Sequence, residues 1–233
     1  MSLPASEQPV GDPVDPRPAP RPERITLRGR HISIVPFDAA VHAAPLFAAV
    51  AGAENDGLWT YLAQGPFADA ERFASFYAAA AQKDDPLLFA LVDPAGRTLG
   101  HACLMRIDAA NRAIEIGNIL YAPALQRTPA ATEAMALFAR HVFEDLGYRR
   151  YEWKCNALNA PSRRAAARLG FTYEGIFRAH MIIKGRNRDT AWFSLLDTEW
   201  PRARAAFDAW LDPANFDAQG RQRQSLEAIR AAL

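Results

Sequence analysis

The chain has 233 residues, with 27 Lys and Arg against 26 Asp and Glu, so its formal net charge at pH 7 is +1. That balance gives no argument for nucleic acid or an anionic membrane as a partner, and we expect neither. No stretch approaches the roughly 20 continuous apolar residues of a membrane span, and the first residues lack a secretory signal pattern. We therefore expect a soluble, cytoplasmic protein, and its 50% hydrophobic content allows a sizeable core.

Residues 1–23 contain seven prolines and almost no large apolar side chains. Such a segment cannot bury enough surface to offset the entropy lost on ordering. We predict a disordered or extended arm without a function of its own. The pattern changes at Ile25, because apolar and polar residues alternate over 25–35 and predict one or two short strands.

The next part of the chain predicts two helices. Asp38 precedes the stretch 39–52, AAVHAAPLFAAVAG, whose apolar spacing and final glycine predict a helix. The stretch 56–62, DGLWTYL, predicts a short turn or helix with aromatic side chains. Residues 69–82 predict a second amphipathic helix with three aromatic side chains on one face.

Three strand patterns follow these helices. The stretches 86–93, PLLFALVD, and 98–108, TLGHACLMRID, flank a Pro/Gly turn and predict an antiparallel hairpin, and 111–121 predicts a third strand. Cys103 lies in one of these apolar runs and Cys155 in a later one. We expect both thiols to be reduced and buried.

The clearest helix spans residues 129–146, with apolar residues at helical spacing and a glycine stop directly after it. The later patterns are a strand at 149–158, a short helix at 161–170, strands at 172–184 and 190–197 around a turn at 185–189, and two helices in the tail. The helix from 129 joins two strands that can lie parallel. We therefore predict an α/β (α+β) domain with a mixed sheet over residues 24–198, followed by a C-terminal helical extension over 199–233.

A strand runs into a loop of small residues and then a helix in IGNILYAPALQRTPAATEAM, residues 116–135. Free backbone N–H groups and the helix dipole at such a helix start favour an anion, and small side chains let it approach. An ordinary helix start explains the same pattern. This stretch alone leaves both interpretations open.

A second stretch, CNALNAPSRRAAARLGFTYEG at 155–175, is more specific. It resembles the closing segment of the GNAT superfamily of N-acetyltransferases, N-x-x-S followed by Gly-Phe and Glu-Gly, in the branch that acetylates ribosomal-protein N-termini. The matching residues are Asn159, Ser162, Gly170, Phe171, Glu174 and Gly175. The resemblance covers about residues 25–197 and implies a mixed, mostly antiparallel sheet flanked by helices, with central strands that splay apart.

In this family the strand-loop-helix unit holds the coenzyme A pyrophosphate with a Q/R-x-x-G-x-G/A pattern. The matching positions, which the resemblance makes candidates for binding acetyl-CoA, are Gln126, Arg127, Thr128, Ala130 and Ala131. Pro129 stands at the first glycine position, where it donates no N–H but suits the first turn of a helix. Asn159 and Arg164 are further candidates for binding the coenzyme. The competing interpretation is a helix cap for Asn159 and a solvated basic surface for Arg164.

The resemblance also implies direct transfer, in which an amine attacks the thioester inside a ternary complex. A backbone N–H near Asn118, Ile119 or Leu120 would stabilise the developing oxyanion. Ser162 would protonate or hydrogen-bond the departing thiolate. We expect no metal to take part.

Two residues are candidates for the group that accepts the amine proton. The Glu115 carboxylate can accept the proton directly or through water. The alternative is that Glu115 is a structural polar residue on a strand face with its hydrogen bonds satisfied. His180 is a suitable residue type, although a lone strand histidine is more often structural. A carboxylate is common near this place in the ribosomal branch, where this chain has Met181.

Trp59 and Tyr61 lie in a stretch that resembles the family's substrate-side loop, so they are candidates for lining the amine pocket, with core packing as the alternative. We predict an acetyl-CoA-dependent N-acetyltransferase that acts on a protein N-terminus or a small-molecule amine, as a monomer or homodimer. Two other classes stay open: a non-catalytic acyl-CoA-binding or regulatory protein on the same fold, and a protein-interaction module that uses the C-terminal helices. Pro129 and Met181 both favour the first of these alternatives.

Overall fold

A single sheet organises the part of the chain that the structure, a computed structural model, describes, which is residues 8–233. Its strands are β1 (Leu27–Arg28), β2 (Ser33–Pro36), β3 (Leu87–Val92), β4 (Thr98–Asp108), β5 (Ala113–Tyr121), β6 (Arg150–Asn156), β7 (Thr172–Ile183) and β8 (Arg186–Leu196). They lie in the order β1-β2-β3-β4-β5-β6-β8-β7. All neighbouring pairs are antiparallel except β5 and β6, which are parallel, so the predicted mixed, mostly antiparallel sheet is confirmed.

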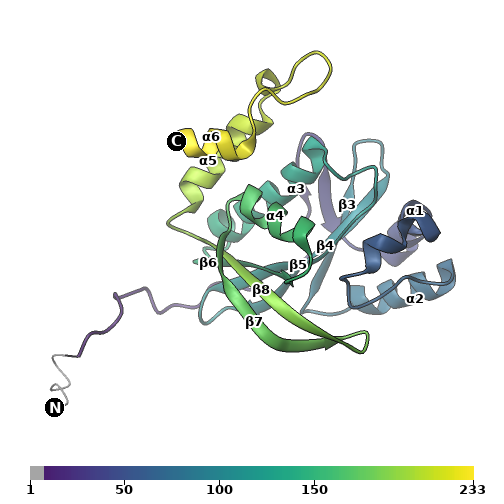
Figure 1. Cartoon of the computed structure of the whole chain (residues 1–233), viewed down its shortest axis with the longest axis horizontal. Coiled ribbons are helices and arrows are strands. Elements are labelled where there is room, and N and C mark those ends of the chain that lie inside the picture. Colours follow the sequence, from purple (N-terminus) through teal and green to yellow (C-terminus); the bar gives the residue numbers. More distant parts are fainter. Residues whose placement is uncertain (1–7) are drawn as a thin grey trace.

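Helices cover both faces of this sheet (Figure 1). They are α1 (Ala39–Val50), α2 (Ala70–Ala81), α3 (Pro129–Arg140), α4 (Ala160–Leu169), α5 (Trp200–Leu211) and α6 (Leu226–Ala232), with short 3₁₀ turns at Ala53–Trp59 and Pro213–Asn215. One hydrophobic cluster joins α1 and α2 to one face of β3 and β4, which we call the α1–α2 face. A larger cluster joins α3 and α4 to the opposite face.

The helix starts follow from capping residues in the sequence. Asp38, Asp69, Thr128 and Asn159 each accept a backbone N–H from the first turn of α1, α2, α3 and α4. Such caps satisfy donors that have no partner inside the helix. At the other end of α4, Gly170 adopts φ 103°, a left-handed conformation that glycine takes without a steric penalty.

Helix α3 ends earlier than its apolar pattern predicts. Its α-helical part stops at Arg140 and continues as one π-helical turn over His141–Asp145. The apolar face is nevertheless the predicted one, because Met135, Phe138 and Val142 are buried. Helix α3 also holds the first hairpin: its Glu133 carboxylate accepts the backbone N–H groups of residues 30, 31 and 32 at 2.8, 2.6 and 3.1 Å.

The turn predicted at residues 185–189 is wrong in its extent. Strand β8 already begins at Arg186, and the chain reverses over Lys184 and Gly185, with φ of 50° and 71°. Two successive residues with positive φ make a tight hairpin whose twist suits the flanking strands. The polar residues after Gly185 are therefore strand residues, and their side chains alternate between the two faces of the sheet.

The predicted arm runs without helix or strand as far as the structure describes it, and its residues 1–7 lie outside the described part. Its later residues contact the domain: the Ala19 N–H donates to the Ala109 carbonyl at 3.0 Å, and Arg112 donates to the Asp15 carbonyl at 2.9 Å. Ala19 is 8% exposed.

The tail packs onto the domain through the apolar residues that its sequence places at helical spacing. Trp200, Ala203, Phe207 and Trp210 of α5 are buried in the larger cluster. Arg230 of α6 donates to the carbonyls of Arg168 and Ala167 and so covers the C-terminal end of α4. The predicted helical extension is therefore docked on the domain, whereas the predicted domain boundaries stay predictions. Within residues 8–233 no helix has the length and apolar character that crossing a membrane requires.

Candidate active site

Strands β5 and β6 pair over only three residues and then diverge. The paired positions are Ala113–Arg150, Ile114–Tyr151 and Glu115–Glu152. Beyond them, β5 continues to Tyr121 and β6 to Asn156 without pairing to each other. Two strand edges thus face an opening with backbone groups that the sheet leaves free. This is the splay of central strands that the sequence resemblance implies.

Strand β5 bulges at Asn118, inside this opening. Two residues lie between Gly117 and Leu120 on β5 where only one lies between His101 and Cys103 on β4, and Asn118 has φ 48°. A bulge re-aims the backbone and is common next to active sites. The Asn118 side chain is held from both sides: its Oδ1 accepts from Gln64 at 2.8 Å and its Nδ2 donates to the Cys103 Sγ at 3.7 Å.

A buried polar pair supports the bulge from the α1–α2 face. The Tyr77 hydroxyl and the His101 Nε2 lie 2.8 Å apart, and both side chains are fully buried. Burial lowers the pKa of His101 to about 3, so its imidazole is neutral. Burial also raises the pKa of the Cys103 thiol to about 12.

The loop after β5 leads into the N-terminus of α3. The Thr128 hydroxyl accepts the Ala131 N–H at 3.2 Å and donates to the Leu125 carbonyl at 2.7 Å, so it shapes the turn. Pro129 stands at the first helical position. Arg127 has φ 60°, which is uncommon for a residue with a side chain. Within the described residues the N–H groups of Arg127 and Thr128 donate no hydrogen bond. The loop therefore presents free donors where the helix dipole favours an anion.

Two further candidates for the coenzyme have defined surroundings. The Gln126 side chain donates to the Tyr121 carbonyl at 3.1 Å, which ties the loop to the end of β5. Arg164 is exposed on α4. Its neighbour Arg168 is committed elsewhere, because it donates to Thr132 and lies over the Trp210 ring.

Ser162 lies on the first turn of α4, beside β6. The Asn159 Oδ1 accepts the Ser162 N–H at 3.1 Å, so Asn159 is the helix cap. The Trp153 indole donates to the Ser162 Oγ at 3.0 Å. An indole N–H can only donate, so the hydroxyl hydrogen of Ser162 stays available for an acceptor, of which the Cys155 sulfur is one. Burial raises the pKa of the nearby Cys155 thiol, and the Ser162 hydroxyl opposes that shift.

Glu115 is part of a charge network at the point where the strands diverge. Its Oε2 lies 2.7 Å from Arg106 and 3.0 Å from Lys154, and its side chain is 3% exposed. Lys154 also contacts Glu152, and Arg150 contacts both Glu152 and Glu174. The network contains three carboxylates and three cations.

The second candidate proton acceptor, His180, lies on the edge strand β7. Its side chain is exposed, and its Nδ1 lies 2.9 Å from the Thr190 hydroxyl. The ring also contacts Phe177 and Trp192. In contrast to Glu115, it has no ion-pair partner among residues 8–233.

Of the two aromatic candidates for an amine pocket, Trp59 is 2% exposed and packs in the α1–α2 cluster. Its indole donates to the Val50 carbonyl at 3.4 Å. Tyr61 is half-buried, and its hydroxyl donates at 3.2 Å to the carbonyl of Leu158, two residues after the end of β6. The position of Tyr61 fits a pocket wall better than that of Trp59.

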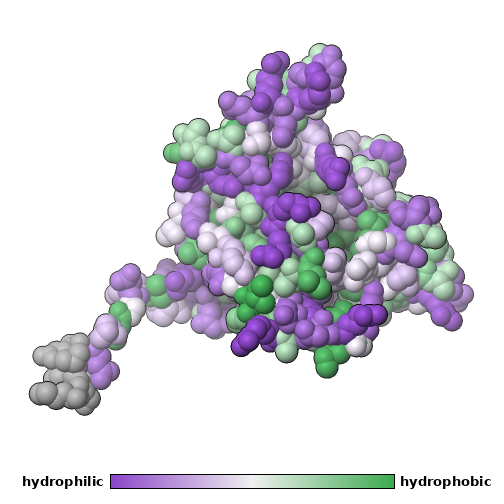
Figure 2. Space-filling view, viewed as in Figure 1, coloured by the Kyte–Doolittle hydropathy of each residue, from purple (hydrophilic) through white to green (hydrophobic). Residues whose placement is uncertain are grey.

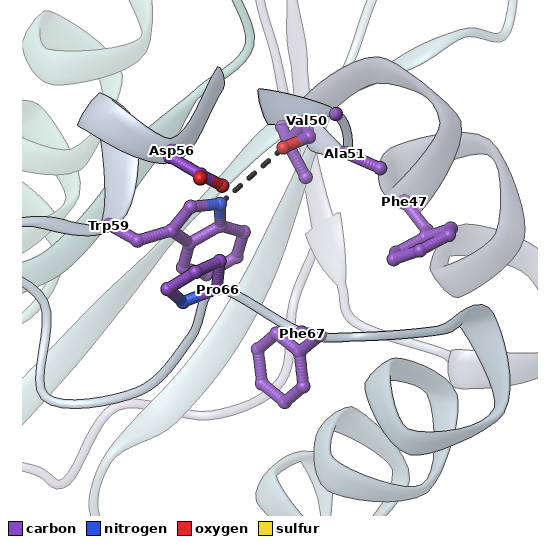
Figure 3. A pocket seen from close by; sticks show the side chains of 8 residues that line it. Phe47, Val50, Ala51, Asp56, Trp59, Pro66 and Phe67 are labelled. Atoms are coloured by element: carbon purple, nitrogen blue, oxygen red, sulfur yellow. Dashed lines mark hydrogen bonds between the residues drawn. The ribbon is translucent and has the colours of Figure 1, made fainter. Parts of the chain in front are cut away.

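A small hollow lies beside Trp59 (Figure 3). It is lined by Phe47, Val50, Ala51, Gly52, Asp56, Trp59, Pro66 and Phe67. Its volume is about 20 Å³, enough for one water molecule. None of its lining residues comes from β5, β6 or α4, so we do not assign a substrate to it.

Three residues of this region are not among the site residues predicted from the sequence. They are Gln64, Trp153 and Arg188. Trp153 had one usable signal, because strand alternation places it on the same face as Cys155 and next to α4. The contact between Gln64 and Asn118 joins residues 54 positions apart and had none. Within residues 8–233 no group of three or more His, Cys, Asp or Glu side chains is placed to hold a metal ion.

Diverging parallel strands, a bulge on the first of them and a helix N-terminus at its end together make up the candidate site. A sequence profile described as "Acetyltransferase (GNAT) domain" matches residues 31–172. The chain therefore belongs to the GNAT acetyltransferase family, whose members use acetyl-CoA, and it is an acetyltransferase.

Relatives agree with this family membership. A Bacillus subtilis protein named "Putative ribosomal N-acetyltransferase YdaF" is 30% identical over 105 residues, which are 45% of this chain and 57% of that protein. The crystal structure of a GCN5-related N-acetyltransferase from Brucella melitensis is 50% identical, with a TM-score of 0.90, over 92% of this chain and 98% of the other. A probable GNAT acetyltransferase from Chromobacterium violaceum is 40% identical, with a TM-score of 0.75, over 83% and 100%.

Proposed function

We propose that the protein transfers the acetyl group of acetyl-CoA to a primary amine by direct attack in a ternary complex. One observation carries this proposal: β5 and β6 separate after Glu115 and Glu152, with the α3 N-terminus at the end of β5 and Ser162 beside β6. An extended thioester arm fits between two such edges because their backbone groups are free to bind it.

The loop before α3 supports the binding of the coenzyme phosphates. The N–H groups of Arg127, Thr128 and Ala130 are available, and Ala130 and Ala131 leave space for close approach. Pro129 removes one donor, and the Arg127 guanidinium supplies charge in its place. Arg164, exposed on α4, is a further contact for a phosphate.

The bulge at Asn118 supports stabilisation of the reacting carbonyl. A backbone N–H of residues 118–120 that points into the opening can donate to the oxygen on which negative charge develops. Gln64 and Cys103 fix the Asn118 side chain, so this donor is held before the substrate arrives. The Ser162 hydroxyl, which Trp153 leaves free to donate, can hydrogen-bond the departing thiolate.

For the proton acceptor we propose His180 over Glu115. The Glu115 carboxylate holds Arg106 and Lys154 in place and has a structural task. The His180 imidazole is exposed, and Thr190 orients it on the α1–α2 face of β7 and β8. It can take the amine proton through water.

The name of the Bacillus subtilis relative favours a protein N-terminus as the acceptor, and a small amine is the second candidate. The test is to incubate the protein with acetyl-CoA and a panel of N-terminal peptides and small amines, and to detect acetylated product by mass spectrometry. A protein that binds acetyl-CoA and acetylates no member of the panel would favour a non-catalytic acyl-CoA-binding role.

A further inference from the structure

One cation beside the candidate active site, Arg188, has no hydrogen-bond or ion-pair partner within residues 8–233. The Arg188 Nε is buried and makes no hydrogen bond among the described residues, and Arg188 forms no ion pair there. Burying a charged N–H donor such as this Nε without a partner is unfavourable, because the hydration of that N–H is lost and nothing replaces it. Such a donor is expected to meet an acceptor from a ligand.

The register of the sheet places Arg188 on the same face as the charge network. The pairs Glu115–Glu152 and Lys154–Trp192 share the α1–α2 face, and Arg188 lies four residues before Trp192 on β8. Its charge interacts with those of Glu115 and Arg106. Arg188 therefore lies on the α1–α2 face, which also carries His180, the proposed proton acceptor, so we call this face the acceptor side of the site.

The neighbouring carboxylates form no ion pair with Arg188 among the described residues. Glu115, Glu152 and Glu174 are each paired with Arg106, Lys154 or Arg150. The Asp189 carboxylate accepts from the Ala179 N–H and the Asn187 amide instead. Since three carboxylates balance three cations in the network, Arg188 is an additional positive charge.

A second buried donor on the same strand face also lacks an acceptor in the described part of the chain. The Trp192 Nε1 is buried and makes no hydrogen bond among residues 8–233. Its ring is fixed between Phe177, at 4.5 Å between centroids, and the Lys154 ammonium, at 4.0 Å. Arg188 and Trp192 thus present two N–H donors that have no acceptor among the described residues, which is a pattern suited to an anion.

Two hydrogen bonds link the segments next to these two residues. Lys184, in the turn between β7 and β8, donates to the Trp59 carbonyl at 2.8 Å, and Tyr61 donates to the Leu158 carbonyl. These two contacts join the β7–β8 hairpin and the end of β6 to the segment between α1 and α2. The Arg188 Nε and the Trp192 Nε1 are themselves buried, so a charge-assisted hydrogen bond that they donate is shielded from water and gains strength.

We propose that Arg188 and Trp192 bind a carboxylate of the acetyl acceptor, so that acceptors carrying a carboxylate near the amine are preferred. This inference rests on the proposed function, because it concerns the acceptor side of the same site. The carboxylate can be the acidic side chain of an N-terminal peptide or the α-carboxylate of a free amino acid. Both sources offer the same chemistry to a guanidinium group.

The test measures binding to the enzyme loaded with CoA, which carries no acetyl group and permits no turnover. Calorimetry compares Ser-Asp-Ala-amide with Ser-Asn-Ala-amide, and alanine with alaninamide. We expect the acidic member of one pair to bind roughly 10-fold more tightly or better, as one charge-assisted contact predicts. The pair that shows the preference identifies the source of the carboxylate.

Matched variants assign the preference to residues. Arg188→Met removes it, while Arg186→Met, at an exposed position two residues earlier on β8, retains it. Arg188→Lys keeps the charge, loses the forked donors and weakens the preference, which covers the case in which Arg188→Met fails to fold. Trp192→Phe also weakens it.

The inference is overturned if the wild-type protein prefers neither acidic probe, or if Arg188→Met binds them as the wild type does. Failure of the proposed function looks different. In that case the preference for the carboxylate and its dependence on Arg188 persist, but acetyl-CoA with the same probes gives no acetylated product. Turnover of neutral amines without any preference for a carboxylate would support the proposed function and contradict the inference about Arg188.

Discussion

The Trp153 indole donates a hydrogen bond to the Ser162 Oγ at 3.0 Å and thereby fixes the direction in which the hydroxyl can donate. Trp153→Phe keeps the ring and removes this bond. We expect Trp153→Phe to lower kcat by roughly 10-fold, because proton donation to the leaving group is misdirected. Ser162→Ala should lower kcat by roughly 10²-fold, because this donation is lost. The Kd for acetyl-CoA should change little in both.

Trp200→Phe is the matched control. It also removes an indole hydrogen bond, the one of 2.8 Å to Glu144, but this bond lies outside the candidate site. Steady-state kinetics and calorimetry on the same preparations provide the comparison. Unchanged kcat in Ser162→Ala would leave Ser162 as a residue of the first helical turn only.

Arg127 should contribute to coenzyme affinity through its charge. Its backbone stands at φ 60° in the loop before α3, with an N–H that is free to donate. Arg127→Glu should weaken acetyl-CoA binding by about 1.5–3 kcal/mol, since it replaces a charge-assisted contact with repulsion. Arg28→Glu, at an exposed position on β1, should leave the Kd unchanged. If Arg127→Glu and the wild type bind acetyl-CoA with equal affinity, residues 126–131 are not the binding site of the coenzyme phosphates.

Glu115 and His180 should respond differently to substitution. Glu115→Gln leaves Lys154, whose side chain is 5% exposed, without one of its counter-charges. Breaking a buried ion pair on one side costs about 3–5 kcal/mol, so the free energy of unfolding should drop markedly. His180→Ala should change it by only about 0.5 kcal/mol, because the side chain is exposed.

Activity decides the roles of these two residues. His180→Ala should lower kcat by roughly 10²-fold at an unchanged acetyl-CoA Kd. A fully active His180→Ala protein, together with a stable but inactive Glu115→Gln protein, would make Glu115 the proton acceptor. Urea unfolding and initial rates supply both readouts.

The sequence identified the main elements of this site but not its contacts. The splay and the helix caps of α3 and α4 follow from local patterns and the N-x-x-S resemblance, because spacing along the chain encodes them. The bulge at Asn118 does not, since it depends on Gln64 and Cys103 arriving from distant segments.

Arg188 shows the same limit in another way. Its stretch, GRNRD, has the polar composition of a turn, and the tight reversal at Lys184 and Gly185 places it in β8 instead. An unpaired buried donor is visible only when all its neighbours are known. No local pattern distinguishes Arg188 from the exposed Arg186.

Stability should fall in mild acid because of His101. Burial lowers its pKa to about 3 in the folded protein, whereas an unfolded histidine titrates near ~6.5. A lowered folded-state pKa contributes stability above pH 6.5, and this is lost as the pH falls toward 3, because only the unfolded state takes up the proton. At pH 5 the loss is about 2 kcal/mol.

Urea unfolding at pH 7 and pH 5 measures this loss, and His101→Gln is the control because its side chain does not titrate. The variant should lose less stability than the wild type between the two pH values. His42, whose pKa burial also lowers, acts in the same direction in both proteins. Identical pH dependence in the two proteins would contradict a neutral, buried His101.

The central claim is that acetyl transfer to an amine occurs in the opening between β5 and β6. The most direct measurement follows thiol release from acetyl-CoA and acetylated amine in the same reaction, for the wild type and Ser162→Ala. We predict that the two products form in a 1:1 ratio, that their formation requires the amine, and that Ser162→Ala slows both without weakening acetyl-CoA binding. Acetyl-CoA binding without amine-dependent thiol release would contradict the claim.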